Sequence, residues 1–365
     1  MAAKKKSAAR SKAAGARDLT RELSVFLEKA LLPDLTERAK DPVVAAALAR
    51  EHAEEQRTHR TSDSLAVWVT KTLEQVGVRW LLSVVFVRTL EDRGLLAQAR
   101  IGGPGANDSQ ALFAELFPTL SDRDYLLTVF REVASAPGAE DLLGPEKNPA
   151  WKLAPSGAVV REILALLRET DAEGTLVFRF DEASRPGTRF LGDLYQDISA
   201  GVRERFALLQ TPDFVEELIL DQTLTPAIET FGLDAVRVLD PTCGSGHFLL
   251  GAFRRLLEAH RLSKPALDSK SHANMALAQV YGVDLNPCAV AIARFRLVLA
   301  YLEAAQIERL ARDLAEPSFE RLFREASPAG FSSGMRSSST AWPPSAHRAA
   351  RVDASGCFDE AQEKT

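Results

Sequence analysis

The feature that most constrains the fold is a short apolar run that ends in an aspartate and a glycine-rich turn. Val236 to Leu239 is typical of a buried strand, and Asp240 follows at its carboxyl end. Gly244 and Gly246 let the backbone turn sharply and approach a ligand without a Cβ atom in the way. Apolar residues then recur at helical spacing: Phe248, Leu249, Ala252, Phe253, Leu256 and Leu257. A strand, a tight turn and a helix in this order predict an α/β sheet that binds a ligand at its strand ends.

The glycine turn is compatible with three kinds of structure. A dinucleotide-binding turn requires Gly-x-Gly-x-x-Gly, but Leu249 stands at the third glycine position. A phosphate-binding P-loop ends in Gly-Lys-Ser/Thr, which this segment does not contain. A bare Gly-x-Gly also fits a helix start that binds nothing. The turn by itself therefore leaves the ligand open.

A second strand-like run, Val280 to Val283, also ends in an aspartate. Asp284 follows it, and Asn286 and Pro287 then open a helix, because proline is favoured in a first helical turn. An acidic side chain at the end of a second strand can accept hydrogen bonds from ribose hydroxyls. Asp-x-Asn-Pro alone is weakly specific, but its position after the glycine turn favours a nucleoside site.

A third segment, Leu209 to Val215, lies upstream of both strands and contains Thr211 and Pro212. Taken alone, Thr-Pro-Asp predicts only the start of a helix. In order along the chain, the three segments are similar to motifs X, I and II of amino-methylating DNA methyltransferases. That family usually has an aromatic residue where this chain has Gln210. The resemblance implies that S-adenosyl-L-methionine is held by Thr211, Pro212, Asp240, Pro241, Gly244, Gly246, Asp284 and Asn286.

The resemblance extends into the helical region that precedes these motifs. The segment Phe86–Leu95 is similar to helices that precede such cores in large restriction and phage-defence enzymes. Over residues 18–317 the chain resembles adenine-specific DNA methyltransferases of the BREX type 2, or phage growth limitation, family. This implies methyl transfer to the adenine exocyclic amine of double-stranded DNA, in phage defence or restriction-modification. It also implies other defence subunits, or a separate chain carrying the C-terminal half, as partners.

One segment that the resemblance requires has no match in the sequence. Such enzymes hold the flipped base with an Asn/Asp-Pro-Pro-aromatic segment after the fourth strand. Asn148–Trp151 lacks the second proline and precedes the glycine turn, and Pro343-Pro344 lies in the serine-rich tail. We therefore name no catalytic residue and expect this chain alone to be inactive. About two of the usual seven strands are expected, which leaves one face of the sheet uncovered.

The domain organisation follows from changes in composition and residue pattern along the chain. We expect a disordered basic arm (1–17), a helical N-terminal domain (18–200), a partial methyltransferase core (201–317) and a disordered, out-of-frame or truncated tail (318–365). Within the helical domain, we expect one helix over Leu65–Val76, capped by Ser62 or Asp63, and another over Trp80–Leu96. Thr175–Phe180 looks like a strand. The fold class is α/β, a helical domain followed by an incomplete Rossmann-like core.

The composition limits which binding partners and which cellular compartment we expect for this chain. The formal net charge of −5 supplies no overall attraction to nucleic acid, although a local basic patch remains compatible with it. Three cysteines without a Cys-x-x-Cys pair argue against a zinc site or a disulfide framework and favour the cytoplasm. His247 follows the glycine turn without a metal-ligand neighbour in the sequence, so we expect a structural role and no metal. No apolar run reaches the ~18 residues that span a bilayer.

Two other functions compete with the DNA methyltransferase hypothesis. One is a non-catalytic DNA- or protein-binding subunit of a defence complex that keeps a vestigial methyltransferase fold. The other is an RNA or protein amino-methyltransferase that shares the same core. Binding of the cofactor separates the first of these from an enzyme.

Overall fold

Helices make up most of the molecule. The computed structural model describes residues 18–135, 139–146, 148–185, 187–198, 211–308 and 332–333. The predicted basic arm, Gln210 and nearly all of the predicted tail lie outside these residues. Before the sheet come α2 (Leu19–Phe26), the π-helical η1 (Leu27–Leu31), α3 (Leu32–Arg38), α4 (Pro42–Arg57), α5 (Leu65–Asp92), α6 (Ala106–Leu116), α7 (Asp122–Ala134), α8 (Glu140–Leu143), the 3-10 turn η2 (Pro149–Trp151), α9 (Gly157–Leu167) and α10 (Arg189–Ile198).

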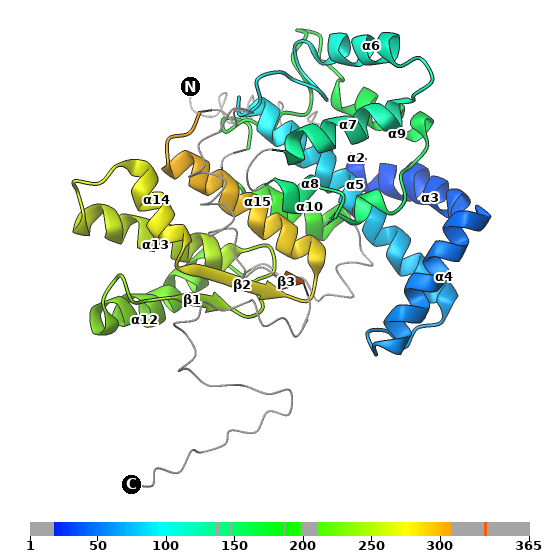
Figure 1. Cartoon of the computed structure of the whole chain (residues 1–365). Coiled ribbons are helices and arrows are strands. Elements are labelled where there is room, and N and C mark those ends of the chain that lie inside the picture. Colours follow the sequence, from blue (N-terminus) through cyan, green and yellow to red (C-terminus); the bar gives the residue numbers. More distant parts are fainter. Residues whose placement is uncertain are drawn as a thin grey trace, which may run out of the picture.

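The remaining elements build a small parallel sheet and its helices. They are α12 (Asp213–Phe231), β1 (Val238–Asp240), α13 (His247–Ser263), α14 (Ser269–Leu277), β2 (Val280–Asp284), α15 (Pro287–Ala304) and β3 (Ser332–Ser333). The strand order is β1-β2-β3, with Asp240 opposite Gly282 and Asp284 opposite Ser333. The expected strand–turn–helix order is therefore present twice, at β1–α13 and β2–α15, and β3 comes from within the predicted tail (Figure 1).

Strand β1 is shorter and more open than the sequence indicated. It begins at Val238 rather than Val236, and the side chain of Leu239 in its centre is 44% exposed. A buried strand was predicted because the run is apolar. Within the part of the chain that the structure describes, no element covers this side of β1, so the apolar pattern is not matched by burial.

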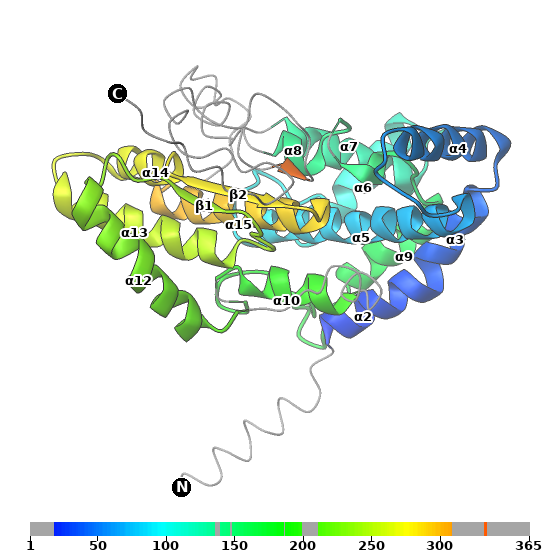
Figure 2. The ribbon, with the colours of Figure 1, turned by 90° about the horizontal axis from the view of Figure 1, so that it is seen from below.

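Helix α5 is the centre of the helical part. It lies between α7 and α8 on one side and α2 and α10 on the other (Figure 2). The prediction of two separate helices is wrong: α5 is continuous over 28 residues, with Ser64 rather than Ser62 or Asp63 at its N-cap. Every residue from Val76 to Leu90 is buried. A helix surrounded on all sides has no polar face, so its sequence loses the periodicity that identifies a helix.

The predicted strand at Thr175–Phe180 is also wrong. This segment is a turn with a single antiparallel bridge between Thr170 and Leu176. Phe178 and Phe180 are buried, and the Phe180 amide donates to Asp92 Oδ2 at 2.8 Å. The alternating aromatic residues therefore anchor a loop to the end of α5 rather than pairing with a neighbouring strand.

One hydrophobic core runs from α2 to α15. Phe86 of α5 stacks on Phe295 of α15 with ring centroids 4.3 Å apart. The predicted domain boundary near residue 200 falls outside the described residues. None of the described helices combines the length and the apolarity needed to cross a bilayer.

A buried ion-pair cluster closes the C-terminal end of α5. Arg88 donates to Glu91 Oε2 and to Asp92 Oδ2, each at 2.7 Å, and to the Gly102 carbonyl at 3.0 Å. Glu91 also accepts the backbone amides of residues 100, 101 and 102. Both Arg88 and Glu91 are fully shielded from solvent. The pair therefore ties the loop after α5 back onto the helix.

We predict that Arg88→Met lowers the free energy of unfolding by about 3–5 kcal/mol, because it leaves two carboxylates without their buried counter-charge. Thermal or urea unfolding measures the change. Arg57→Met, which removes an exposed ion pair with Glu54 on α4, is the matched control and leaves the melting temperature unchanged. Equal, small effects in both variants would contradict the buried role of Arg88.

Candidate active site

Two aspartates lie together where the parallel strands end. Asp240 ends β1 and Asp284 ends the adjacent β2. The Gly244 amide donates to Asp284 Oδ2 at 2.8 Å, and the Asn286 amide donates to Asp284 Oδ1 at 2.7 Å. Asp284 therefore holds the turn that follows the other strand. The two carboxylates share one edge of the sheet, as carboxyl ends of parallel strands must.

The glycine turn leads directly into helix α13. Gly244 and Gly246 have positive φ angles of 52° and 82°, which favour glycine. A Cβ atom at Gly246 would lie 2.8 Å from Ala293 Cβ, whereas one at Gly244 would meet nothing within 4 Å. No side chain in the described part of the chain caps the first amides of α13. The turn thus packs closely against α15 at Gly246 and is open beside Gly244. The uncapped backbone amides at the start of α13 lie next to this opening. Pro241 is exposed within the same turn.

The site carries concentrated negative charge. Burial raises the pKa of the Asp240 carboxyl, and the nearby Asp284 raises it further, while the Thr242 amide, 3.1 Å from Oδ1, opposes both effects. Repulsion between two partly desolvated carboxylates is relieved by a cation or by hydroxyl donors. Burial also raises the pKa of Cys243 and Cys288, so both are protonated thiols rather than nucleophiles.

Two buried contacts that the sequence did not predict join the helical part to this site. Arg296 on α15 donates to the Ser245 carbonyl at 2.7 Å and to Thr188 Oγ1 at 3.2 Å. Burial lowers the pKa of its guanidinium to about 10, which still leaves it charged at neutral pH. Asn286 caps α15 and donates to the Tyr195 hydroxyl at 2.6 Å. The available signal for Arg296 was a charged side chain inside the apolar run of α15, which also contains Arg294.

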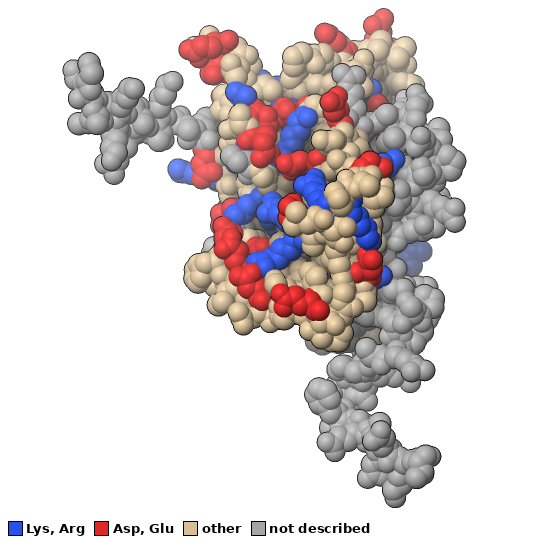
Figure 3. Space-filling view, turned by 90° about the vertical axis from the view of Figure 1, so that its left-hand side faces the viewer, with Lys and Arg blue, Asp and Glu red and all other residues tan. Residues whose placement is uncertain are grey.

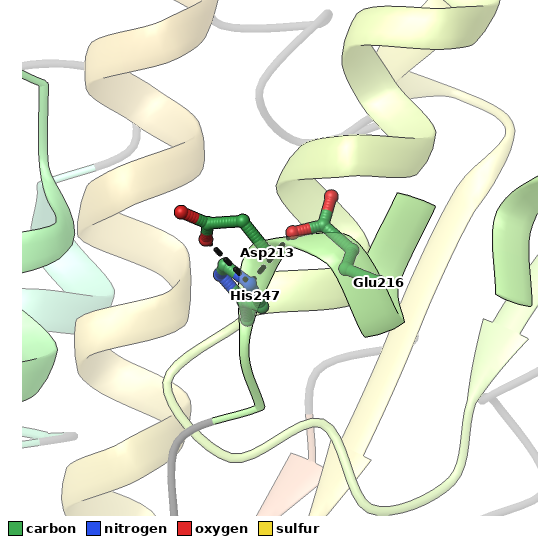
Figure 4. Close-up of side chains that lie close together, drawn as sticks. All are labelled: Asp213, Glu216 and His247. Atoms are coloured by element: carbon green, nitrogen blue, oxygen red, sulfur yellow. Dashed lines mark ion pairs between the residues drawn. The ribbon is translucent and has the colours of Figure 1, made fainter. Parts of the chain in front are cut away.

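The Thr211-Pro212 segment starts α12. The Pro212 carbonyl accepts from the Val215 and Glu216 amides, as the helix-start interpretation predicts. The first turn of α12 lies against the first residue of α13: His247 Nε2 is 2.7 Å from Glu216 Oε2 and 3.3 Å from Asp213 Oδ1 (Figure 4). The expectation that His247 has no metal-ligand neighbour is therefore wrong, because its neighbours come from a helix that begins 34 residues earlier in the chain.

Asn148, the nearest sequence match to a base-holding segment, has a structural role. Its side chain is buried, accepts from the Ala150 amide and donates to Ser83 Oγ and to the Leu142 carbonyl. It is therefore part of the packing around α5. Pro343-Pro344, the other partial match, lies outside the described residues.

Among the described residues, the surface that carries α12, α13 and α14 shows no continuous basic patch. Figure 3 shows lysine and arginine side chains interspersed with acidic ones on this face. Arg255, for example, pairs with Asp221, and Lys264 pairs with Asp234. Binding of nucleic acid by this face would rest on local groups rather than on a broad positive potential.

Comparison with known proteins gives three relatives and one family model. Residues 229–319 match the model of the MmeI DNA-methyltransferase domain. The chain is 39% identical over 295 residues to the adenine-specific methyltransferase PglX of Streptomyces coelicolor, which covers 77% of this chain and 24% of PglX. It is 26% identical over 198 residues to a type II methyltransferase of Microbacterium ammoniaphilum, covering 54% of this chain and 51% of that protein.

A third relative matches a shorter part of the chain. A putative type II restriction enzyme and methyltransferase of Methanocaldococcus jannaschii is 41% identical over 85 residues, 22% of this chain and 7% of that protein. The chain spans about a quarter of the length of PglX and half of the Microbacterium enzyme. The resemblance seen in the motifs is thus confirmed: the chain is a homologue of the adenine-specific methyltransferase PglX, and its residues 229–319 match the model of the MmeI DNA-methyltransferase domain.

Proposed function

We propose that this chain is the cofactor-binding part of an S-adenosyl-L-methionine-dependent adenine DNA methyltransferase of a phage-defence system. The observation that carries the proposal is the hydrogen bond from the Gly244 amide to Asp284, which joins the two strand ends into one site. Homology to PglX supports adenine as the target base. The resemblance to BREX type 2 proteins supports the defence role and double-stranded DNA as the partner.

The residues at the site fit this cofactor chemically. Asp284 would accept the ribose hydroxyls, as acidic residues at a second strand end do. The uncapped amides at the start of α13 and the open space beside Gly244 would face the amino-acid part. The negative charge of Asp240 would attract the positive charge of the ligand, because burial leaves this carboxylate poorly solvated. Thr211 and Pro212 would line the same site from the start of α12. Pro241 and Gly246 would shape the glycine turn. Asn286 would hold the loop that follows Asp284.

The bound cofactor would supply an electrophilic methyl group, and the protein would align the adenine amine with it. The base must leave the duplex to reach the site. None of the 365 residues forms the Asn/Asp-Pro-Pro-aromatic segment that would hold it. Helix α12 carries large exposed apolar side chains: Phe214, Leu218, Ile219 and Phe231. Of these, Phe214 and Leu218 lie one turn apart on the same face of the helix. Exposed apolar neighbours are typical of surfaces that pack against a further segment or partner, so we propose that such a segment supplies the base-holding residues.

Asp284→Ala is expected to weaken binding of S-adenosyl-L-methionine by about 10- to 100-fold, because charge-assisted hydrogen bonds are lost. Isothermal titration calorimetry of the full chain measures this. The control is Asp234→Ala, which removes an exposed carboxylate paired with Lys264 and leaves the affinity unchanged. A folded wild-type chain that does not bind the cofactor would favour the non-catalytic subunit instead.

Asp240→Asn should have different effects on the stability of the fold and on the affinity for the cofactor. The amide keeps the acceptor for the Thr242 amide but removes a charge whose pKa is raised by burial and by Asp284. Because the ionised form of a group with a raised pKa destabilises the fold at pH values above that pKa, the substitution leaves the melting temperature at pH 7.5 unchanged or higher. Cofactor affinity falls in the same variant. A lower melting temperature in Asp240→Asn would show that the charge supports the fold.

Methyl transfer by the chain alone is expected to be undetectable, since nothing in it matches the base-holding segment. Incubation with double-stranded DNA and methyl-labelled cofactor, followed by nucleoside analysis for N6-methyladenine, tests this. Labelled adenine at a level above an Asp284→Ala control would refute the proposal that the base-holding segment lies elsewhere.

A further inference from the structure

A histidine and two carboxylates converge where α12 meets α13. Asp213 and Glu216 lie three residues apart on α12, so both side chains project from one face of its first turn. His247 is the first residue of α13 and points toward them (Figure 4). One ligand atom from each of the three residues lies within 4.8 Å of the other two. Three potential metal ligands from two helices therefore surround one point.

Among the residues that the structure describes, the imidazole nitrogen at this point has no hydrogen-bond partner. His247 Nε2 is inaccessible to solvent, and its short contact with Glu216 Oε2 does not have the geometry of a hydrogen bond. Buried polar atoms in proteins are almost always paired, so an unpaired one calls for another partner. A metal ion bound to Nε2 would supply that partner.

The chain also makes room for the Glu216 carboxylate. A Cβ atom at Gly251, one turn further along α13, would lie 1.7 Å from Glu216 Oε1. The Glu216 side chain is only 13% exposed, whereas Asp213 is 68% exposed. The site thus has one shielded carboxylate, Glu216, which packs against Gly251, and one exposed carboxylate, Asp213, on its solvent side.

The donor set suits a zinc-class divalent ion. Zinc takes imidazole and carboxylate ligands at about 2.0–2.2 Å in tetrahedral geometry, which sets neighbouring ligand atoms about 3.3 Å apart. The Nε2–Oδ1 distance between His247 and Asp213 is 3.3 Å. Glu216 Oε2, at 2.7 Å from Nε2, would withdraw by about half an ångström to reach the same spacing. Arg189 pairs with Asp213 and would have to share or release it, which the exposed position of Asp213 allows.

We propose that Asp213, Glu216 and His247 bind one zinc-class divalent metal ion that joins the start of α12 to the start of α13. Water would complete the coordination on the open side. The ion would fix the Thr211-Pro212 segment relative to the glycine turn. This role does not depend on cofactor binding, and the test below contains no S-adenosyl-L-methionine, so failure of the proposed function leaves it intact.

The test is titration of the chelator-treated full chain with Zn²⁺ by calorimetry and with Co²⁺ by visible absorption. We expect one equivalent to bind with micromolar affinity, and a Co²⁺ spectrum with d–d bands but no thiolate charge-transfer band. Glu216→Gln, His247→Ala and Asp213→Asn each weaken binding by about tenfold or more, since each removes a ligand. Asp213 is exposed, so its variant keeps the fold even if the other two do not.

Matched controls separate this site from adventitious metal binding. Asp221→Asn removes another arginine-paired carboxylate on the same helix, and His59→Ala removes an exposed histidine. Both leave the affinity unchanged. Absence of saturable binding, a thiolate band, or equal affinity in wild type and Asp213→Asn would each overturn the proposal.

Discussion

The hydrogen bond from the Gly244 amide to the Asp284 carboxylate is the contact on which the candidate site depends. It crosses from the turn after β1 to the end of β2, forty residues later in the chain. A backbone amide can reach that carboxylate only because two glycines with positive φ bend the turn. Asp240 is thereby brought beside Asp284, and the mutual repulsion of these two carboxylates makes the site suited to a cationic or hydroxyl-bearing ligand.

The helical part of the chain contributes directly to this arrangement. Thr188 and Tyr195 contact Arg296 and Asn286, which in turn hold the glycine turn and the loop after β2. The stacking of Phe86 on Phe295 places α15 against α5 within one core. Helix α15 contacts β2, and α5, α8 and α10 pack in turn on α15, so the helices before the sheet support the covered side of the sheet. This explains why the similarity to PglX extends well beyond the methyltransferase domain match.

The sequence predicts an element correctly where the preferences of a few neighbouring residues fix it. It predicts an element wrongly where burial against distant parts of the chain decides the structure. The places of Asp284 at a strand end, of Asn286 at a helix N-cap and of the glycines in a tight turn could be predicted because each residue type is favoured there. The long helix α5 was divided in two because complete burial removed its polar face. Thr175–Phe180 was assigned to a strand, but its aromatic side chains are buried in a loop whose Phe180 amide donates to Asp92.

The sequence by itself determined the order of strand, turn and helix, the positions of the carboxylates at the strand ends, and the similarity of residues 229–319 to a DNA-methyltransferase domain. These depend on backbone preferences of glycine, proline and asparagine that act over a few residues. Tertiary structure alone decided the partners of Arg296 and His247. Their charges and ring nitrogens are buried against groups from other elements, and the free energy of a buried polar group depends on which partner packing brings to it.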